Sequence, residues 1–340
     1  MRSDTSLNVP SAPQASHIKY TTIKGYFLQS EDSTDSSTFN FKTNNFGLIN
    51  RSYETDGSGD AEVRKTQWQR FVRYVEYVNE ESGEGVWFKV LFMGRHGQGW
   101  HNVAEDKYGT PAWDCYWSKL DGADGITWAD ADLTELGEKQ AEGVSEFWKS
   151  HLTVEGGGIP VPQSYYLSPL TRAIRTAEIT FAGLELPESA PFKPVVKELL
   201  REAIGVHTCD RRSTATHILG AFSSSLALTL EPHFSETDPL WTADLREPDS
   251  ALKVRMATLL DDVFTHDDSA FVSFTSHSGA IGMLLEALGH RKWNLQTGEI
   301  IPVFVRAERV SGEREEGSEE PSGTAPSCTT MIHVTGVPPL

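Results

Sequence analysis

The chain has 340 residues, and 30 Lys and Arg against 48 Asp and Glu give it a formal charge of −18. Hydrophobic residues make up 38% and charged residues 23%, which is typical of globular proteins and excludes a wholly disordered chain. The acidic balance argues against nucleic acid as a partner, because such binding surfaces are basic. No apolar run approaches the roughly 18 residues of a membrane span, so no membrane partner is expected. An anionic substrate therefore needs a local cationic pocket.

Three segments differ in composition from the rest of the chain. Residues 1–16 are rich in Ser, Pro and Asn and predict a flexible tail without the apolar core of a signal peptide. We therefore expect a cytoplasmic or nuclear protein that is not secreted. Residues 29–60 are polar and turn-rich and predict irregular surface structure. Residues 308–327 are acidic and rich in Gly and Pro, which predicts a disordered loop.

Strand-like runs alternate with helical stretches along the remaining chain. Strands are expected at residues 88–93, 164–168, 194–200, 271–276 and 301–307, with a short last one at 328–334. Helices are expected at residues 61–79, 133–152 (capped by Thr134), 170–182, 250–264 and 279–288. This alternation predicts an α/β fold, a three-layer sandwich with a mostly parallel central sheet and helices on both faces.

Two of the expected strands end in a histidine followed by small residues. The first runs into His96 and Gly97, and the second into His277, Ser278 and Gly279. The carboxyl ends of parallel strands meet at one edge of a sheet, which is where ligands bind in this class of fold. A glycine at such a position lets the backbone turn sharply. The pattern therefore places two imidazoles at one candidate site.

Cationic and acidic groups follow two further strands. Arg172 and Arg175 lie on the first turns of a helix that begins after Ser168, and free N–H groups at a helix start favour anions. Another strand run ends with Glu202. Displacement at phosphorus needs cationic donors, an in-line nucleophile and an acid for the leaving oxygen. An imidazole can serve as the nucleophile and carry the phosphoryl group covalently.

Each of these residues also has a structural interpretation. A histidine after a strand is more often structural than catalytic, and the arginines and Glu202 could be surface charges. The coincidence of two histidines at strand ends with an arginine-bearing helix start favours a site. His96 and His101 lack the H-E-x-x-H spacing, and no CxxC pair is present, so neither a metal nor a cofactor is expected.

The segment MGRHGQGWHN resembles the signature of the histidine phosphatase superfamily, in its phosphoglycerate mutase-like branch. Further landmarks follow in that family's order and lie within residues 86–306. They are LTELGEKQA at 133–141, SPLTRAIRTA at 168–177, LLRE at 199–202 and TSHSG at 275–279. VHTCDRRS at 206–213 is similar to fungal phosphomutase-like proteins. The resemblance implies one domain over residues 17–340 with a phosphoglycerate mutase-like fold and a cap insertion at about 105–131.

The same resemblance assigns roles to residues. His96 matches the nucleophile and Glu202 the proton donor, while Arg95, Arg172 and His277 match the residues that hold the phosphoryl oxygens. Further substrate contacts are expected from Asn102, Gln98, Gly97, Ser278, His207, Arg211 and Arg212. The last three would contact a second anionic group, although a charged surface loop is an equal interpretation.

The leading hypothesis is metal-independent hydrolysis of a small phosphorylated or otherwise anionic metabolite. A phosphomutase with the same residues is the first alternative. A non-catalytic phosphate-binding protein and an enzyme turned to a non-phosphate metabolite are the others, because fold and ancestry do not fix function. The sequence indicates neither the substrate nor the oligomeric state.

Overall fold

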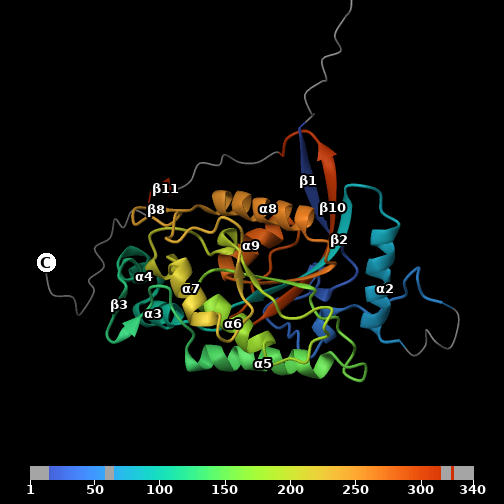
Figure 1. Cartoon of the computed structure of the whole chain (residues 1–340), viewed down its shortest axis with the longest axis horizontal. Coiled ribbons are helices and arrows are strands. Elements are labelled where there is room, and N and C mark those ends of the chain that lie inside the picture. The colour runs from blue at the N-terminus through green and yellow to red at the C-terminus, as the bar shows by residue number, and fades with distance from the viewer. Residues whose placement is uncertain (1–14, 58–64, 315–322, 325–340) are drawn as a thin grey trace, which may run out of the picture.

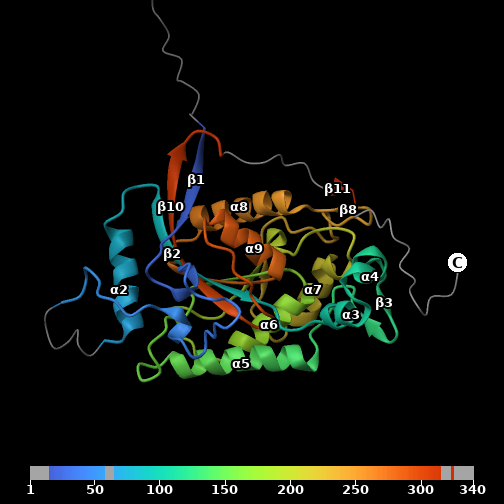
Figure 2. The same cartoon turned by 180° about the vertical axis from the view of Figure 1, so that it is seen from behind.

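A seven-stranded sheet forms the centre of the computed structural model, which describes residues 15–57, 65–314 and 323–324 (Figures 1 and 2). In spatial order the strands are β1 (Ser16–Thr22), β10 (Ile300–Ser311), β2 (Val86–Arg95), β9 (Phe271–Ser276), β5 (Ser164–Leu167), β6 (Val195–Val196) and β7 (Thr229–Leu230). The five strands from β2 to β7 run parallel to one another, whereas β10 is antiparallel to both β1 and β2. The predicted mostly parallel sheet is confirmed.

Helices cover both faces of the sheet, which confirms the predicted three-layer α/β sandwich. On one face lie α8 (Asp249–His266) and α9 (Ser278–Ala287); on the other lie α2 (Gln67–Glu80), α5 (Glu135–His151), α6 (Thr171–Phe181) and α7 (Ala215–Phe222). Strand β2 shows why, because its apolar residues alternate between the two cores. Val90 and Phe92 pack with α2, α5 and α6, while Leu91 and Met93 pack with α8 and α9.

Local capping explains where two of the predicted helices begin. The Thr66 hydroxyl accepts a hydrogen bond from the Gln69 N–H, and the Gln69 side chain accepts one from the Thr66 N–H. Helix α2 therefore starts at Gln67, and residues 61–64 of the predicted helix lie outside the described residues. The Thr134 hydroxyl accepts from the Gly137 N–H at 3.1 Å and opens α5 as predicted. Such caps stabilise a helix by about 1 kcal/mol.

Several predicted boundaries are wrong. The expected strand 194–200 is only two residues long, and η4 (Glu198–Leu200) replaces its end. The disordered loop was expected to begin at residue 308, but residues 308–311 belong to β10 and pair with β1. Within the same expected loop, Gly323–Thr324 form β11, which pairs with β8 (Leu245–Arg246). Residues 1–14 and the expected strand 328–334 lie outside the described residues.

The turn-rich segment at 29–60 is irregular, as predicted, but it does not lie wholly on the surface. Phe41 and Phe46 are buried and join the core beneath α2 and α5. Strand β1, which the sequence analysis missed, covers the edge of β10. Burial of aromatic rings explains why so polar a segment is held against the domain.

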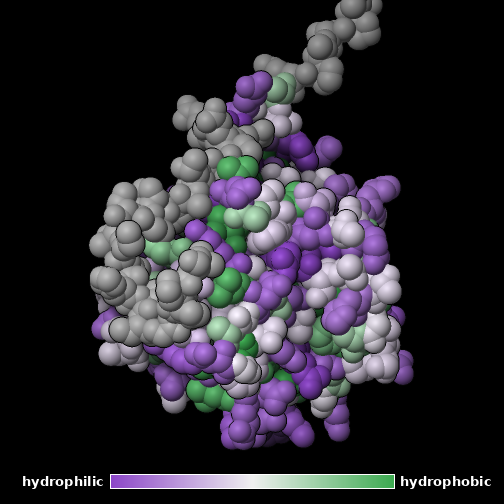
Figure 3. All heavy atoms as spheres, turned by 90° about the vertical axis from the view of Figure 1, so that its left-hand side faces the viewer, coloured by the Kyte–Doolittle hydropathy of each residue, from purple (hydrophilic) through white to green (hydrophobic). Residues whose placement is uncertain are grey.

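Residues 100–131, which include the insertion expected at about 105–131, form a group of short elements with a small core of their own. We call residues 100–131 the cap; it contains α3 (Trp100–Tyr108), α4 (Thr110–Cys115), η3 (Trp117–Lys119), β3 (Gly122–Ala123) and β4 (Ile126–Thr127). Trp113 and Trp128 pack there against Cys209. Figure 3 views the molecule from the cap side, where hydrophilic and hydrophobic residues are mixed. Among the described residues, no helix is long and apolar enough to cross a membrane.

Candidate functional site

The register of three parallel strands brings the predicted residues together at one edge of the sheet. Arg95 at the end of β2 pairs with Ser276 at the end of β9, and Leu167 of β5 pairs with Thr275. His96 and His277, which follow Arg95 and Ser276, therefore leave the sheet at the same edge. The centroids of the His96 and His277 rings are 5.0 Å apart.

His96 is held with one ring nitrogen facing the site. Its side chain is buried, and Nδ1 lies 2.6 Å from the carbonyl oxygen of Gly97. Because a carbonyl oxygen only accepts, Nδ1 carries the hydrogen and Nε2 keeps its lone pair. Burial, and secondly the Arg172 guanidinium, hold the pKa of His96 well below 6.5. His96 is therefore neutral at pH 7, the form in which an imidazole is a nucleophile.

Gly97 is a glycine because helix α5 crowds it. A Cβ at position 97 would lie 2.3 Å from the carbonyl oxygen of Gly137 in α5. The Gly97 N–H donates to the hydroxyl of Thr176 in α6 at 3.0 Å. The backbone after His96 is therefore fixed by α5 and α6 together, and no larger residue fits at position 97.

Arg172 lies against His96 and is anchored by a segment that follows Glu202. Its Nε–H points to His96 Nε2 at 3.4 Å, while Nη1 and Nη2 donate to Cys209 O at 2.6 Å and Asp210 Oδ1 at 3.0 Å. The other oxygen of Asp210 accepts from Arg246 Nη1 at 2.8 Å. Burial would raise the pKa of Asp210, but Arg246 and Arg172 together lower it, so the carboxylate is ionised.

Glu202 lies at the N-terminus of the helix that follows His277. Its Oε1 accepts from the N–H groups of Ala203 and Ala280, and its Oε2 accepts from that of Gly279, all at 3.0–3.1 Å. Arg255 donates to the carbonyl oxygens of residues 199, 201 and 202 and so holds the chain that carries Glu202. These contacts fix the position of the Glu202 carboxyl group beside the start of α9.

His277 and Arg95 are both expected to hold the phosphoryl oxygens. Each has one buried side-chain nitrogen without a hydrogen-bond partner among the described residues. His277 Nε2 shares a hydrogen bond of 2.7 Å with the Ser168 hydroxyl, and its Nδ1 makes none. Arg95 Nη1 donates to Leu295 O at 2.8 Å, and its Nε makes none. Burial and the neighbouring arginine Arg172 lower the pKa of His277 well below 6.5.

Three further residues predicted to contact the substrate, Asn102, Gln98 and Ser278, lie at or beside the starts of helices. The Asn102 side-chain oxygen accepts from the Gly99 N–H at 3.0 Å and opens α3. The Gln98 side-chain oxygen accepts from the Thr134 hydroxyl at 2.8 Å, so it faces the start of α5. Ser278 is exposed at the first position of α9.

The structure separates His207, Arg211 and Arg212. His207 is mostly buried beside Trp113 of the cap, and burial lowers its pKa to about 4. Arg211 is partly exposed and pairs with Asp121 of the cap at 2.7 Å. The Arg212 guanidinium is enclosed by Glu198 and by the carbonyl oxygens of residues 213, 235, 236 and 237. Arg212 is thus not brought into the cluster around His96.

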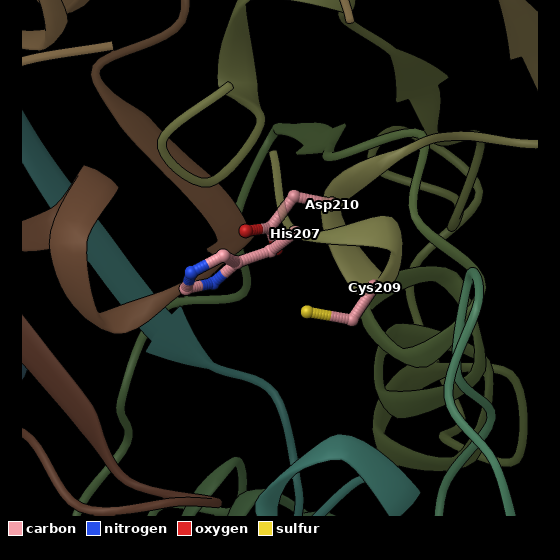
Figure 4. Close-up of side chains that lie close together, drawn as sticks. All are labelled: His207, Cys209 and Asp210. Carbon is pink, nitrogen blue, oxygen red and sulfur yellow. The ribbon is translucent and has the colours of Figure 1, made fainter. Parts of the chain in front are cut away.

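One group of side chains has the residue types of a metal site. Figure 4 shows His207, Cys209 and Asp210, whose possible ligand atoms lie within 4.8 Å of one another. Both oxygens of Asp210 already bind arginines, and burial raises the pKa of the Cys209 thiol well above its usual value. A cation there would face Arg172 and Arg246, so the group does not fit a metal ion.

Sequence reasoning missed residues that hold the predicted ones in place. Asp210 lies within VHTCDRRS, a segment whose histidine and arginines are more conspicuous as candidates for binding an anion. Arg246 and Arg255 come from segments without any motif, and only the fold brings them to Asp210 and Glu202. The sequence motifs assign no role to His101, yet its ring centroid lies 5.3 Å from that of His96.

The fold and this cluster define an α/β protein with a buried, cationic site built around a neutral histidine. The profile of the histidine phosphatase superfamily (branch 1) matches residues 118–301, more than half of the chain. The chain is 48% identical over 303 residues to a "Probable phosphoglycerate mutase" of Arthroderma benhamiae, covering 89% of each. It therefore belongs to the histidine phosphatase superfamily, which confirms the resemblance seen in the motifs.

Two further similarities are more distant. The chain is 34% identical to "Phosphomutase-like protein 3" of Candida albicans, over 86% of this chain and 82% of that protein. A phosphoglycerate mutase from Thermus thermophilus matches with a TM-score of 0.33 and 22% identity, over 63% of this chain and 91% of that chain.

Proposed function

We propose that this protein hydrolyses phosphomonoesters through a phosphohistidine on His96, without a metal ion. The observation that carries the proposal is the 2.6 Å contact of His96 Nδ1 with Gly97 O, from which we infer that the Nε2 lone pair faces Arg172. Buried nitrogens of Arg95 and His277 that lack protein partners among the described residues supply further donors for phosphoryl oxygens. Such preorganised donors stabilise the charge that develops in displacement at phosphorus.

The residues in place allow a balanced two-step reaction. In the first step His96 Nε2 attacks phosphorus, the ester P–O bond breaks, and the leaving oxygen takes a proton from the Glu202 carboxyl group. In the second step water attacks phosphorus, the P–N bond breaks, and the Glu202 carboxylate accepts the proton of water. The hydrogen bonds of Glu202 to Gly279 and Ala280 position that carboxylate for the second step.

The test compares His96→Ala with His266→Ala, a matched change at an exposed histidine. A panel of phosphate esters is assayed for phosphate release in the presence of a chelator. We expect His96→Ala to lose about 10⁴-fold or more in kcat, and the control to match the wild type. Rapid quenching with a labelled ester should yield an acid-labile phosphohistidine in the wild type only. Undiminished turnover by His96→Ala would refute the proposal.

The names of the Arthroderma benhamiae and Candida albicans relatives favour a mutase as the second candidate. The same residues would serve, but His96 would return the phosphoryl group to another oxygen of the substrate. The near-complete burial of His96, at 2% exposed, would limit the access of water to the phosphoenzyme. A phosphoglycerate with a labelled phosphoryl group distinguishes the two reactions. A mutase transfers the labelled group to another oxygen of the product, and a phosphatase releases it as phosphate.

A further inference from the structure

A third imidazole lies beside His96, and the proposed mechanism does not use it. His101 lies in the first turn of α3, its side chain is 9% exposed, and its ring is tilted by 55° to that of His96 at a centroid distance of 5.3 Å. Its Nδ1 is buried and has no hydrogen-bond partner among the described residues. In this respect it is like Arg95 Nε and His277 Nδ1.

The residue before α3 leaves space next to this nitrogen. Gly99 has φ −100° and ψ 165°, an extended backbone that any residue adopts, so the glycine is not needed for conformation. A Cβ at position 99 would lie 2.7 Å from His101 Nδ1 and 3.4 Å from Arg172 Cδ. The missing side chain therefore keeps a small space open between His101 and Arg172.

We propose that His101 is a further catalytic residue, whose Nδ1–H donates a hydrogen bond to an oxygen of the phosphoryl group that His96 accepts. This inference rests on the proposed function. It accounts for a buried polar atom without a protein partner among the described residues, and such atoms are uncommon in folded proteins.

The surroundings of His101 keep it a neutral donor. Burial, and secondly Arg172 and His96, hold the pKa of His101 well below 6.5. Arg172, His96, Arg95 and His207 each disfavour a proton there. A neutral imidazole still carries one N–H, so His101 can add a hydrogen bond without adding charge to a site that already holds two arginines.

The test uses three substitutions that differ in where they place a donor. Phe keeps the ring but has no donor, Asn places its amide nitrogen near the position of Nδ1, and Gln places it near Nε2. We expect His101→Phe to lower kcat/KM for aryl and alkyl phosphates by about 10²-fold. His101→Asn should recover at least about tenfold of this loss, and His101→Gln should not. His217→Phe, at an exposed position of α7, is the matched control.

A second pair of variants tests the space at Gly99. Gly99→Ala keeps an allowed backbone but pushes against His101 Nδ1, so it should reduce kcat/KM as His101→Phe does. Gly220→Ala in α7 is the control, because a Cβ there meets nothing within 4 Å. Equal losses in the Phe, Asn and Gln variants would show that His101 only packs, and would overturn the proposal.

Binding of orthovanadate, a mimic of pentavalent phosphorus, provides a readout without turnover. Calorimetry should show about tenfold weaker binding by His101→Phe than by the wild type, and stronger binding by Asn than by Gln. If the wild type releases no phosphate from any ester but shows this order of vanadate binding, the proposed hydrolysis fails and the phosphoryl contact of His101 stands. Equal vanadate affinity in the wild type and His101→Phe would overturn the contact itself.

Discussion

Glu202 and Gly279 contact each other at the start of α9, directly after His277. The Gly279 N–H donates to Glu202 Oε2 at 3.0 Å, and a Cβ at position 279 would lie 2.3 Å from Oε1. The turn that ends β9 therefore positions both His277 and the carboxyl group proposed as the acid. A glycine is needed there because the carboxylate occupies the space of a side chain.

Gly279→Ala should displace Glu202 while leaving the helix intact. Alanine favours a helix over glycine by up to about 1 kcal/mol, so the free energy of unfolding should change little. We expect kcat for alkyl phosphates to fall about 10²-fold, because their leaving oxygen needs the proton, and kcat for aryl phosphates to fall less.

Gly282→Ala is the matched control for this prediction. Gly282 lies one turn further along α9, and a Cβ there meets nothing within 4 Å. Kinetics on both substrate classes, with a melting curve for each variant, separate the two effects. If Gly279→Ala slows neither class, Glu202 is not the proton donor at this position.

The buried histidines make the stability of the protein depend on pH. Burial lowers the pKa values of His96, His101 and His277 well below 6.5, and those of His207 and His290 are lowered as well. The unfolded chain takes up protons on these side chains below pH 6.5, whereas the folded chain does not until their lower pKa values are reached. Stability is therefore fully present above pH 6.5 and is lost as the pH falls.

Urea unfolding at pH 7.5 and 5.5 tests whether the free energy of unfolding falls as the pH falls. A histidine that stays neutral in the folded state should cost about 1.4 kcal/mol of unfolding free energy at pH 5.5. His290→Gln removes one histidine with a lowered pKa away from the site, so it should reduce the pH-dependent loss. An unfolding free energy that rises between pH 7.5 and 5.5 would show that these side chains are not neutral in the folded state.

The sequence predicted the site because its key residues follow strands. His96 and His277 come directly after β2 and β9, and parallel pairing of Arg95 with Ser276 was enough to bring them together. The α/β alternation and the Thr134 cap could also be predicted, because local sequence patterns specify them. Strand β1 was not predicted, because its sequence is polar and its pairing partner, the edge of β10, lies almost 300 residues further along the chain.

Residues that act through long-range contacts escaped prediction. Arg246 and Arg255 bind Asp210 and the carbonyl of Glu202, yet nothing in their own segments indicates this. Arg212 is the opposite case. It lies in the segment VHTCDRRS, from which a contact with the substrate was predicted, but its guanidinium binds Glu198. Distance along the chain does not determine which way a loop side chain points.

Phosphate release should survive removal of divalent ions. The one group of described residues with metal-ligand types, His207, Cys209 and Asp210, has its carboxylate bound by Arg172 and Arg246. Dialysis against a chelator should therefore leave kcat unchanged on every ester that the protein accepts. A loss restored by one divalent ion would contradict the metal-independent mechanism.

Arg211 and Arg212 are neighbours whose replacement should have different consequences. The Arg212 side chain is fully buried and binds Glu198, so Arg212→Ala should lower the unfolding free energy by about 3–5 kcal/mol. Arg211 is partly exposed and lies over the Trp241 ring, so Arg211→Ala should cost about 1 kcal/mol or less. Thermal melting of the two variants measures this difference.

The kinetics of Arg211→Ala test the predicted contact with a second anionic group. If Arg211 binds that group, its loss should raise KM several-fold for a phosphomonoester that also carries a carboxylate, and leave an aryl phosphate unchanged, because the contact is equal in the ground and transition states. Asp121→Asn then provides the contrast, since it frees the guanidinium that Asp121 now holds at 2.7 Å. A binding role predicts a lower or equal KM for the same substrate in Asp121→Asn. If the two variants raise KM alike, the pair only fixes the cap against residues 206–213, and recognition of a second anionic group must come from elsewhere in the cap.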